Sequence, residues 1–521
     1  MNVAKNSAPS TQHSALLPLI ALHLAVTLPL AYLLNIWVDE ASTLYTTENG
    51  FSSALQNALA QEKQAPLYFW VLSLWRALNG SVFFARLLSI IFSVAAIIVF
   101  QRLARKFFGP RESFFITAFF ALHPFLIWAG LEIRVYSLVI LLSVLLLNFF
   151  TEAYLQEEKN AGARPRIFFS LTAAAALYAN YYLGFVLAGC FAALLVRRNF
   201  KSARRFFFDM IFVAAVFAPL VWAVREQFAA NTAGFQVEKT PGEALRLLWN
   251  HFLTFVFPTE LFPTAEQTFV SFIRVWAARF GIAAAAFLLV RSFYRNWKNA
   301  RRGNDAAVRL TGLDRGLLFF GAVSATVFLF LTVSYFLLGP VYVGLRHAAV
   351  WFAPVVLTGF AVLMKIIPRR GLVAFAALYI FLFSYSVFTL YPNLAKRGDW
   401  ARVAEYIEQN ERPGQPIVIF TAFDALALPY YYRGVNHVLP DERFFDFEME
   451  APEGSAASWL RQTEFIISEI PPDAEEIWLL TNEKCEIEEA CRPLENFVRA
   501  NYNVVNTKAF YLEKVRLLRK K

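Results

Sequence analysis

Long apolar stretches are the feature of this sequence that most limits what it can fold into. Several of them reach about 20 residues, the length that crosses the hydrocarbon core of a membrane as an α-helix. Hydrophobic residues make up 58% of the chain, whereas soluble domains contain about 45–50%. We therefore predict an α-helical polytopic membrane protein. The first stretch, 15–37, is too long for a cleavable signal and no small-residue cleavage site follows it, so it is predicted to remain as a helix.

About eleven membrane-spanning helices are predicted. Their expected ranges are 15–36, 83–101, 113–129, 135–153, 167–179, 182–197, 206–224, 270–291, 316–338, 347–365 and 371–391. With the N-terminus in the cytoplasm, the inside segments hold 23 Lys and Arg, against about 7 in the outside loops between helices. Because Lys and Arg favour the cytoplasmic side, this asymmetry predicts an N-in topology. An odd number of helices then places the C-terminal tail outside.

Two of the predicted outside loops are long. Residues 37–82 contain "FSSALQNALAQEKQAPLYFWVLSLWRALNG", and residues 225–269 contain "GEALRLLWNHFLTFVFP". Their dense Trp and Phe residues favour helices that lie in the membrane interface over simple extracellular loops.

The chain changes character after the last apolar stretch. From residue 395 onwards acids outnumber bases by 22 to 16, whereas the rest carries a net charge of about +16, mostly in short loops. "DWARVAEYIEQN" has helical spacing, and "ERPGQPIVIF" and "EEIWLLTN" contain strand-like runs. We predict a transmembrane domain, 1–393, with a small extracytoplasmic α/β domain, 394–521. Basic residues that punctuate apolar segments argue against a nucleic-acid partner.

The three cysteines fall into two groups. Cys190 lies in an apolar run and is expected to pack there, while Cys485 and Cys491 are six residues apart in the tail. No nearby His or second Cys pair accompanies them, which argues against zinc. In an exported tail we expect them to form a disulfide.

Two acids, Asp39 and Glu40, follow the first apolar stretch in "WVDEAST". A solvated helix end is the usual explanation for one such acid, but other outside loops carry polar residues too. They lie in "EKQAPLYFW", "GLEIRVYSL", "YANYYLG" and "GPVYVGLRHAAVWFAP", and are Lys63, Gln64, Glu132, Arg134, Tyr136, Asn180, Tyr181, Tyr182, Tyr342, Arg346 and His347. Ionisable residues at membrane depth are candidates for a site, so together they predict one outward-facing cavity.

A lipid-phosphate-linked sugar suits this set of side chains. Arginines clamp phosphate, a carboxylate accepts the proton of an attacking hydroxyl, and a membrane boundary accommodates a lipid tail. In this hypothesis Asp39 is the base, and Arg134 and Arg346 hold the leaving phosphate. No G-x-G-x-x-G or GxxxxGK[ST] pattern is present, so nothing indicates nucleotide binding.

The segment from about 37 to 400 resembles the polytopic C-class glycosyltransferases related to protein O-mannosyltransferases and to bacterial aminoarabinose and Rgt-type transferases. "WVDEAST" is the most specific motif. "QAPLYFWVLSLWRALNGSVFFARLLS", "EIRVYSL", "GLRHAAVWFAP" and "RGDWARVAEYI" add to the resemblance.

The resemblance implies a polyprenyl-phosphate sugar donor, an inverting reaction, a catalytic base at Asp39 and Glu40 as its partner. It places Arg134, Tyr136 and Arg346 at the donor phosphate. We expect a protein of the bacterial inner (plasma) membrane with its active site outside the cytoplasm. "QAP" and "LYANYYLG" depart from the residues frequent in relatives, which leaves the sugar and the acceptor open, whether glycan, lipid or protein. Some members use a divalent metal, but no extra acid cluster accompanies this motif, and we expect no cofactor.

Three other functions are compatible with parts of the sequence. A polymerase or ligase of polyprenyl-linked glycans would use long outside loops but would not need the acidic motif of the first loop. A lipid or solute transporter often shows internal repeats, and none is seen. A membrane sensor with an external domain would leave the acids and arginines unexplained.

Overall fold

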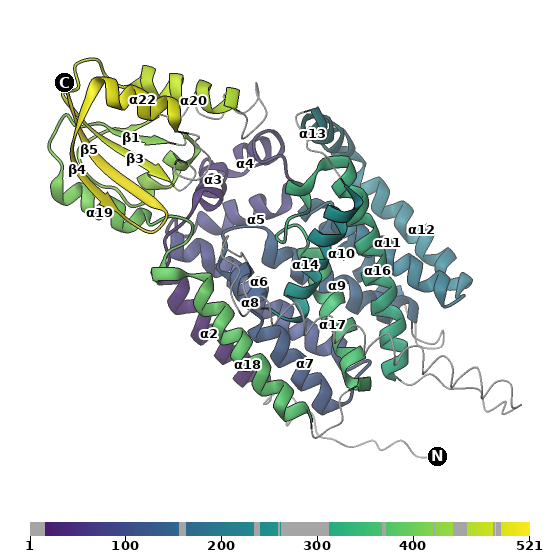
Figure 1. The fold of residues 1–521 in the computed structure, drawn as a ribbon. Coiled ribbons are helices and arrows are strands. Elements are labelled where there is room, and N and C mark those ends of the chain that lie inside the picture. The colour runs from purple at the N-terminus through teal and green to yellow at the C-terminus, as the bar shows by residue number, and fades with distance from the viewer. Residues whose placement is uncertain are drawn as a thin grey trace, which may run out of the picture.

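The computed structural model describes residues 16–155, 163–233, 240–258, 261, 312–366, 371–420, 422–440, 456–482, 485 and 491–521. Figure 1 shows a bundle of helices with a small sheet domain at one end. The bundle contains α2 (Leu16–Leu33), α6 (Val82–Ala104), α7 (Pro110–Leu122), α8 (Pro124–Leu131), α9 (Tyr136–Phe150), α10 (Ala163–Ala179), α11 (Leu183–Val196), α12 (Phe200–Phe217), α16 (Gly312–Leu338), α17 (Ala349–Ile366) and α18 (Gly371–Leu390).

The chain is a multi-pass membrane protein by the length and composition of these helices. Within the described ranges six helices are long and apolar enough to cross a membrane, or seven if the bent pair α7 and α8 forms one span. Two shorter apolar helices, Leu183–Val196 and Ala349–Met364, add to them. The count of eleven and the N-in orientation stay predictions, and the predicted span 270–291 falls outside the described residues.

Two helix breaks have local causes. Helices α7 and α8 meet at a bend of 47°, where Pro124 begins the second helix and the ring of His123 accepts a hydrogen bond from the Phe125 amide. Proline fits the first helical turn but interrupts a helix interior, so the span predicted over 113–129 is bent into two helices. The break between the predicted helices 167–179 and 182–197 is confirmed, because α10 ends at Ala179 and α11 begins at Leu183. At this break the Asn180 side chain accepts a hydrogen bond from the Tyr182 amide.

Helix α9 is the most enclosed of the spanning helices. In its span 78% of the residues are buried, the highest share among the six, and Figure 1 shows it inside the bundle.

The close approach of α11 and α16 depends on Gly189, where an added Cβ would lie 2.9 Å from the Cα of Val323. Small residues at such crossings let membrane helices approach closely.

The two long predicted loops contain helices. The first loop forms α3 (Val38–Thr46), α4 (Gly50–Ala60) and α5 (Leu67–Arg76), and the second contains α14 (Pro241–Val256). Helix α13 (Val221–Ala233) begins before the second loop, and Phe200–Ala229 forms one of the six long apolar spans. Helix α14 begins with a capping box, in which the side chains of Thr240 and Glu243 exchange hydrogen bonds with the backbone. That these helices lie in the membrane interface stays a prediction.

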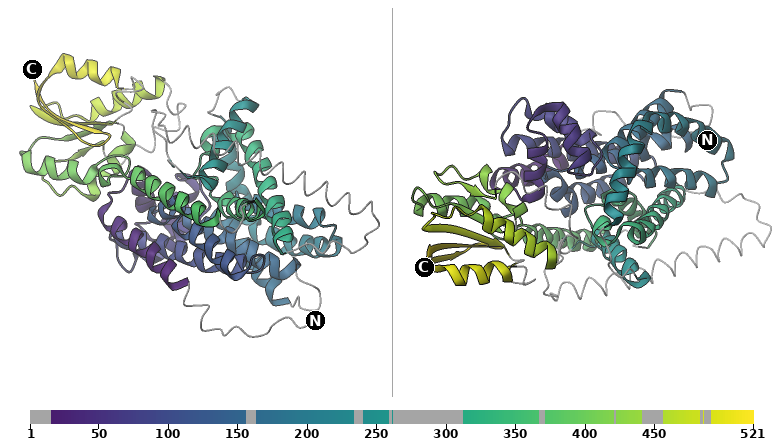
Figure 2. Two further views of the ribbon diagram at one scale, coloured as in Figure 1. Left: turned by 60° about the horizontal axis from the view of Figure 1, so that its bottom comes forward. Right: turned by 90° about the horizontal axis from the view of Figure 1, so that it is seen from above.

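The described part of the C-terminal domain contains a five-stranded sheet with strand order β2-β1-β3-β5-β4. Strands β1 (Ile417–Phe420), β2 (Val438–Leu439) and β3 (Glu476–Asn482) are parallel, and β5 (Glu513–Lys520) pairs antiparallel with β3 and with β4 (Tyr502–Ala509). Helices α20 (Ala456–Glu469) and α22 (Arg492–Asn501) cover one face, and α19 (Trp400–Asn410) covers the other (Figures 1 and 2). Burial on both faces explains the continuous apolar run of β1. Cys485 and Cys491 are joined as a disulfide.

The sheet domain and the connection that leads to it both contact the segment that follows α2. Asn35 donates its side-chain amide to the carbonyl oxygens of Lys396 (3.1 Å) and Gly398 (3.0 Å). The hydroxyl of Tyr431 accepts a hydrogen bond from the Ile36 amide at 2.6 Å. Because α3 begins two residues later, the sheet domain and the acidic motif lie at the same end of the bundle.

Candidate functional site

The centre of the candidate site is an ion pair between Asp39 and Arg346. Asp39 lies in the first turn of α3, where the positive end of the helix dipole favours a carboxylate. Its Oδ2 is 2.7 Å from Nη1 of Arg346, which lies just before α17. The Asp39 side chain keeps 17% of its exposure and that of Arg346 keeps 32%. A substrate can therefore reach both partners.

Arg134 lies beside this pair but is itself buried. Its Nη1 donates to the backbone oxygen of Asp39 (3.1 Å), to Oγ1 of Thr43 (2.6 Å) and to Oε2 of Glu62 (2.8 Å). Burial lowers the pKa of Arg134, but Glu62 and Asp39 outweigh that effect and hold the pKa well above its ordinary value. Arg134 thus stays charged and fixes the backbone at Asp39.

Tyr136 completes the group around Asp39. Its ring stacks on Trp128 with a centroid separation of 4.9 Å. Burial lowers the pKa of Arg346, but Tyr136 and Asp39 outweigh it and raise the pKa above the ordinary value. The three residues expected at the donor phosphate, Arg134, Tyr136 and Arg346, therefore lie together next to Asp39. Their role at a phosphate stays a prediction.

Glu40 has a different environment from its neighbour Asp39. Its side chain is fully buried and accepts hydrogen bonds from Arg86 Nε (3.3 Å) and Nη2 (3.1 Å), while Lys396 Nζ lies 3.0 Å away. Burial raises the pKa of Glu40, but Arg86 and Lys396 outweigh it and hold the pKa below the ordinary value. Glu40, expected in the catalytic pair as the partner of Asp39, is thus sealed away from the partly exposed carboxylate of Asp39. Its role in catalysis stays a prediction.

Glu132, predicted to line the cavity, belongs to the same buried cluster. Its Oε1 lies 3.0 Å from Lys396 Nζ and its Oε2 accepts a hydrogen bond from Trp37 Nε1 at 2.7 Å. Burial and the charge of Glu40 together raise the pKa of Glu132, against the opposing effect of Lys396. We name Glu40, Arg86, Glu132 and Lys396 the buried charge cluster.

Three partners in this region were not identified from the sequence. Arg86 lies within an apolar run, and an arginine at membrane depth is itself a signal for a buried partner. Glu62 directly precedes Lys63 and Gln64, which were chosen from "EKQAP". Lys396 gives no local signal, because its partners are far away in the sequence.

The remaining predicted cavity residues occupy several places. The Tyr182 hydroxyl donates to the backbone oxygen of Tyr342 at 2.7 Å, and its ring lies 6.1 Å from that of His347, next to Arg346. Gln64 donates to Glu62 at 3.3 Å, which links it to Arg134.

Three predicted cavity residues have other local roles. Lys63 has a left-handed backbone conformation, φ 51°, before α5. Asn180 shapes the start of α11, and the ring of Tyr181 packs against Phe217. Among the described residues no hydrogen bond or ion pair joins these three to Asp39.

No group of three or more His, Cys, Asp or Glu side chains that could hold a metal ion occurs in the described part of the chain. The expectation that no cofactor takes part stays a prediction.

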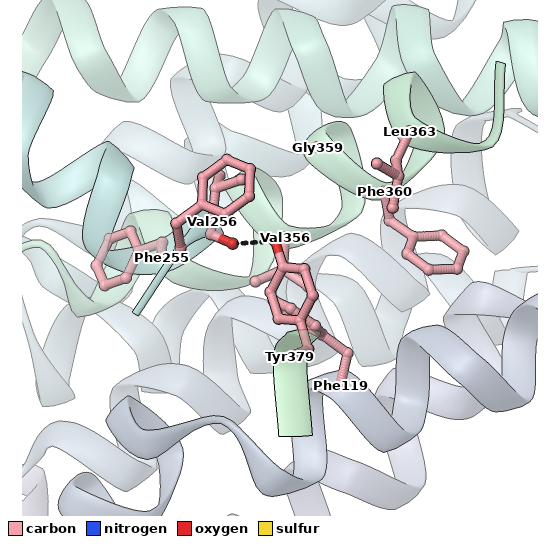
Figure 3. A pocket seen from close by; sticks show the side chains of 9 residues that line it. Phe119, Phe255, Val256, Val356, Gly359, Phe360, Leu363 and Tyr379 are labelled. Atoms are coloured by element: carbon pink, nitrogen blue, oxygen red, sulfur yellow. Dashed lines mark hydrogen bonds between the residues drawn. The ribbon is translucent and has the colours of Figure 1, made fainter. Parts of the chain in front are cut away.

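A separate cavity of about 40 Å³ lies between α7, α14, α17 and α18 (Figure 3). Phe119, Phe255, Val356 and Phe360 contribute to its wall, and Tyr379 donates its hydroxyl hydrogen to the backbone oxygen of Val256. Its lining contains no charged side chain, so it shares no residue with the site around Asp39.

No family model and no curated protein matches the chain. Solved structures similar to it include ArnT from Cupriavidus metallidurans, bound to undecaprenyl phosphate (14% identity, 96% of this chain and 97% of that chain, TM-score 0.45) and in the apo state (15%, 97% and 98%, 0.44). The Archaeoglobus fulgidus oligosaccharyltransferase tethered to an acceptor peptide is similar at 12% identity over 96% and 73%, with a TM-score of 0.46.

Because the identities are 15% or lower and the TM-scores are below 0.5, the function of this chain has to be argued from its own site.

Proposed function

We propose that this protein is an inverting membrane glycosyltransferase that moves a sugar from a polyprenyl-phosphate donor to an extracytoplasmic acceptor. The observation that carries the proposal is the partly exposed Asp39–Arg346 pair with Arg134 and Tyr136 beside it. A carboxylate next to two guanidinium groups, at one end of a membrane bundle, supplies a base and a phosphate site together. The acceptor class, the sugar and a location in the bacterial inner membrane belong to the same proposal.

Arg346 has a double role in this mechanism. Without a donor it neutralises Asp39, because the two side chains are 2.7 Å apart. A donor phosphate offers Arg346 a second anion in the geometry that guanidinium groups favour. Sharing Arg346 with the phosphate leaves the carboxylate of Asp39 free to accept a proton.

The transfer itself is one displacement. The acceptor oxygen forms a bond to the anomeric carbon as the bond from that carbon to the phosphate oxygen breaks. The acceptor proton passes to Asp39, and the phosphate leaves with the bonding electron pair and its charge beside Arg346. Attack from the face opposite the leaving phosphate inverts the configuration. Electrostatic stabilisation of the departing anion supplies much of the rate enhancement.

Arg134 contributes through charge and position. It donates hydrogen bonds to the backbone oxygen of Asp39 and to the side-chain hydroxyl of Thr43, which hold α3 in place. Its guanidinium also adds positive charge to the place where phosphate charge develops. Tyr136, beside Arg346, would donate its hydroxyl hydrogen to the same phosphate.

Mass spectrometry of envelope glycans tests this function. We compare cells with the intact protein, with Asp39→Asn, with Glu48→Gln and without the protein. Glu48 is an exposed acid of the same loop and serves as the matched control. We expect one sugar to disappear in the deletion and in Asp39→Asn and to persist in Glu48→Gln, with equal protein levels.

Two results would count against the proposal. Glycans that are identical in all four cell types would exclude the transferase. Loss of the sugar in the deletion but not in Asp39→Asn would leave a transferase with a different base.

A further inference from the structure

Lys396 connects two segments that are distant in the sequence. Its Nζ lies 3.0 Å from Oε1 of Glu40 and 3.0 Å from Oε1 of Glu132, and it donates to the backbone oxygen of Leu131 at 2.7 Å. The side chain is 2% exposed. Lys396 itself lies between α18 and α19, in the connection from the membrane bundle to the sheet domain.

The two carboxylates that Lys396 contacts stand next to the residues of the site. Glu40 follows Asp39 in α3, and Glu132 is two residues before Arg134. The ammonium group therefore joins the segment that carries the proposed base to the segment that carries the buried arginine. A direct link between these segments already exists, because Arg134 donates to the backbone oxygen of Asp39. Lys396 links the same two segments a second time, through Glu40 and Glu132.

The buried charge cluster is electrically balanced, with two acids and two bases. Arg86 directs its remaining donors to the backbone oxygens of Ala31, Leu34 and Asn35, at 3.0, 2.5 and 2.7 Å. Buried ion pairs are often no more stabilising than well-packed apolar residues of similar volume. Such a cluster instead fixes a geometry. Here it fixes the position of the segment that carries Asp39 relative to the segment that carries Arg134.

The backbone around Lys396 depends on its surroundings. Asn393, Leu394 and Arg397 have φ values of 56°, 55° and 33°, and Gly398 has a φ of 118°. Non-glycine residues rarely adopt positive φ, and such conformations persist where the surrounding contacts determine them. Those contacts include the hydrogen bonds of the Asn35 side chain, which accepts from the backbone amide of Lys396 and donates to the backbone oxygens of Lys396 and Gly398. The connection is thus held in one conformation against the first loop.

We propose that Lys396 is a positioning residue for the sugar transfer. By holding Glu40 and Glu132 at one ammonium group, it sets the distance between Asp39 and Arg134. The geometry of the site therefore depends on the position of the connection to the sheet domain. This inference rests on the proposed function. A small misplacement of a catalytic group can lower a rate by about 100-fold, so the effect belongs in kcat rather than in the donor KM.

The test separates positioning from charge balance. Lys396→Met leaves two buried acids facing one base, whereas Lys396→Met with Glu132→Gln leaves Glu40 and Arg86, one of each. We compare the single variant, the double variant, Asp39→Asn and the exposed-lysine control Lys508→Met. The donor is the undecaprenyl-phosphate form of whichever sugar the deletion cells lose, and membranes of those cells are the acceptor.

We expect the double variant to recover the yield and thermal transition of the wild type, while its kcat stays lower by about 10- to 100-fold with little change in donor KM. Hydrogen exchange of residues 38–46 should be faster in the double variant than in Lys508→Met. Wild-type kcat in the double variant, or unchanged exchange in 38–46, would overturn the role of Lys396. No transfer by the wild type, or full activity of Asp39→Asn, would instead overturn the proposed function.

Discussion

Replacing Arg86 by methionine should destabilise the protein and reverse the way in which Glu40 responds to pH. The substitution removes a fully buried cation from Glu40, and leaving one partner of a buried ion pair alone costs about 3–5 kcal/mol. Lys396, 3.0 Å from Glu40, compensates in part, so we expect the lower end of this range. At about 1.4 kcal/mol for each factor of ten, the folding equilibrium falls by at least about 100-fold.

The sign of the pH effect follows from the causes of the pKa of Glu40. In the wild type, burial raises this pKa but Arg86 and Lys396 hold it below the ordinary value. The contribution of Glu40 to stability is therefore present above the unfolded pKa of about 4.3 and is lost as the pH falls through the folded pKa. Without Arg86, burial raises the folded pKa above the unfolded one. The contribution of Glu40 is then present below pH ~4 and is lost as the pH rises through the folded pKa.

Thermal unfolding of the detergent-solubilised protein at pH 5 and pH 8 measures this difference. Relative to the wild type, Arg86→Met should lose more stability at pH 8 than at pH 5. The control Arg86→Met with Glu40→Gln lacks the titrating carboxylate and should lose this dependence. It should still lack the three hydrogen bonds to Ala31, Leu34 and Asn35, worth about 1 kcal/mol each. Equal losses at both pH values in the single variant would refute the reasoning.

Two further predictions concern the site and the bundle. Arg346→Ala should lower kcat by about 100- to 1,000-fold, because it removes a donor from the developing phosphate charge; steady-state kinetics with the polyprenyl-phosphate donor would show this, and an unchanged kcat would exclude contact with the phosphate. Gly189→Ala should lower stability by about 1–3 kcal/mol, because the added Cβ meets Val323 at 2.9 Å; thermal unfolding checks the value, and a transition equal to that of the wild type would mean that α11 and α16 separate without cost.

The sequence predicts most of the apolar helices that the structure describes, and it proposes Asp39 as a site residue. Apolar runs of about 20 residues indicate membrane-spanning helices directly, and the acidic motif follows the first of these runs. The sequence was insufficient for separating Asp39 from Glu40. Neighbouring residues of a helix point about 100° apart, so one acid faces the partly exposed site and the other faces the interior.

Ion pairs between residues that are distant in the sequence could not be predicted either. Glu40 is 46 residues from Arg86, and Lys396 comes after the last spanning helix. Only folding brings these charges together. Arg86 alone indicates that a buried charge cluster exists, since a charge within an apolar span requires a partner.

The position of Lys396 has a consequence for where the protein can be divided. A cut between residues 393 and 394, where the composition changes, would assign Lys396 to the sheet domain. The membrane half would then retain two sealed carboxylates with one guanidinium, and would lose the backbone groups that Asn35 binds. The physical border therefore lies after Gly398, near the start of α19. A chimaera that exchanges the outer domain for another should keep residues 393–398 with the bundle.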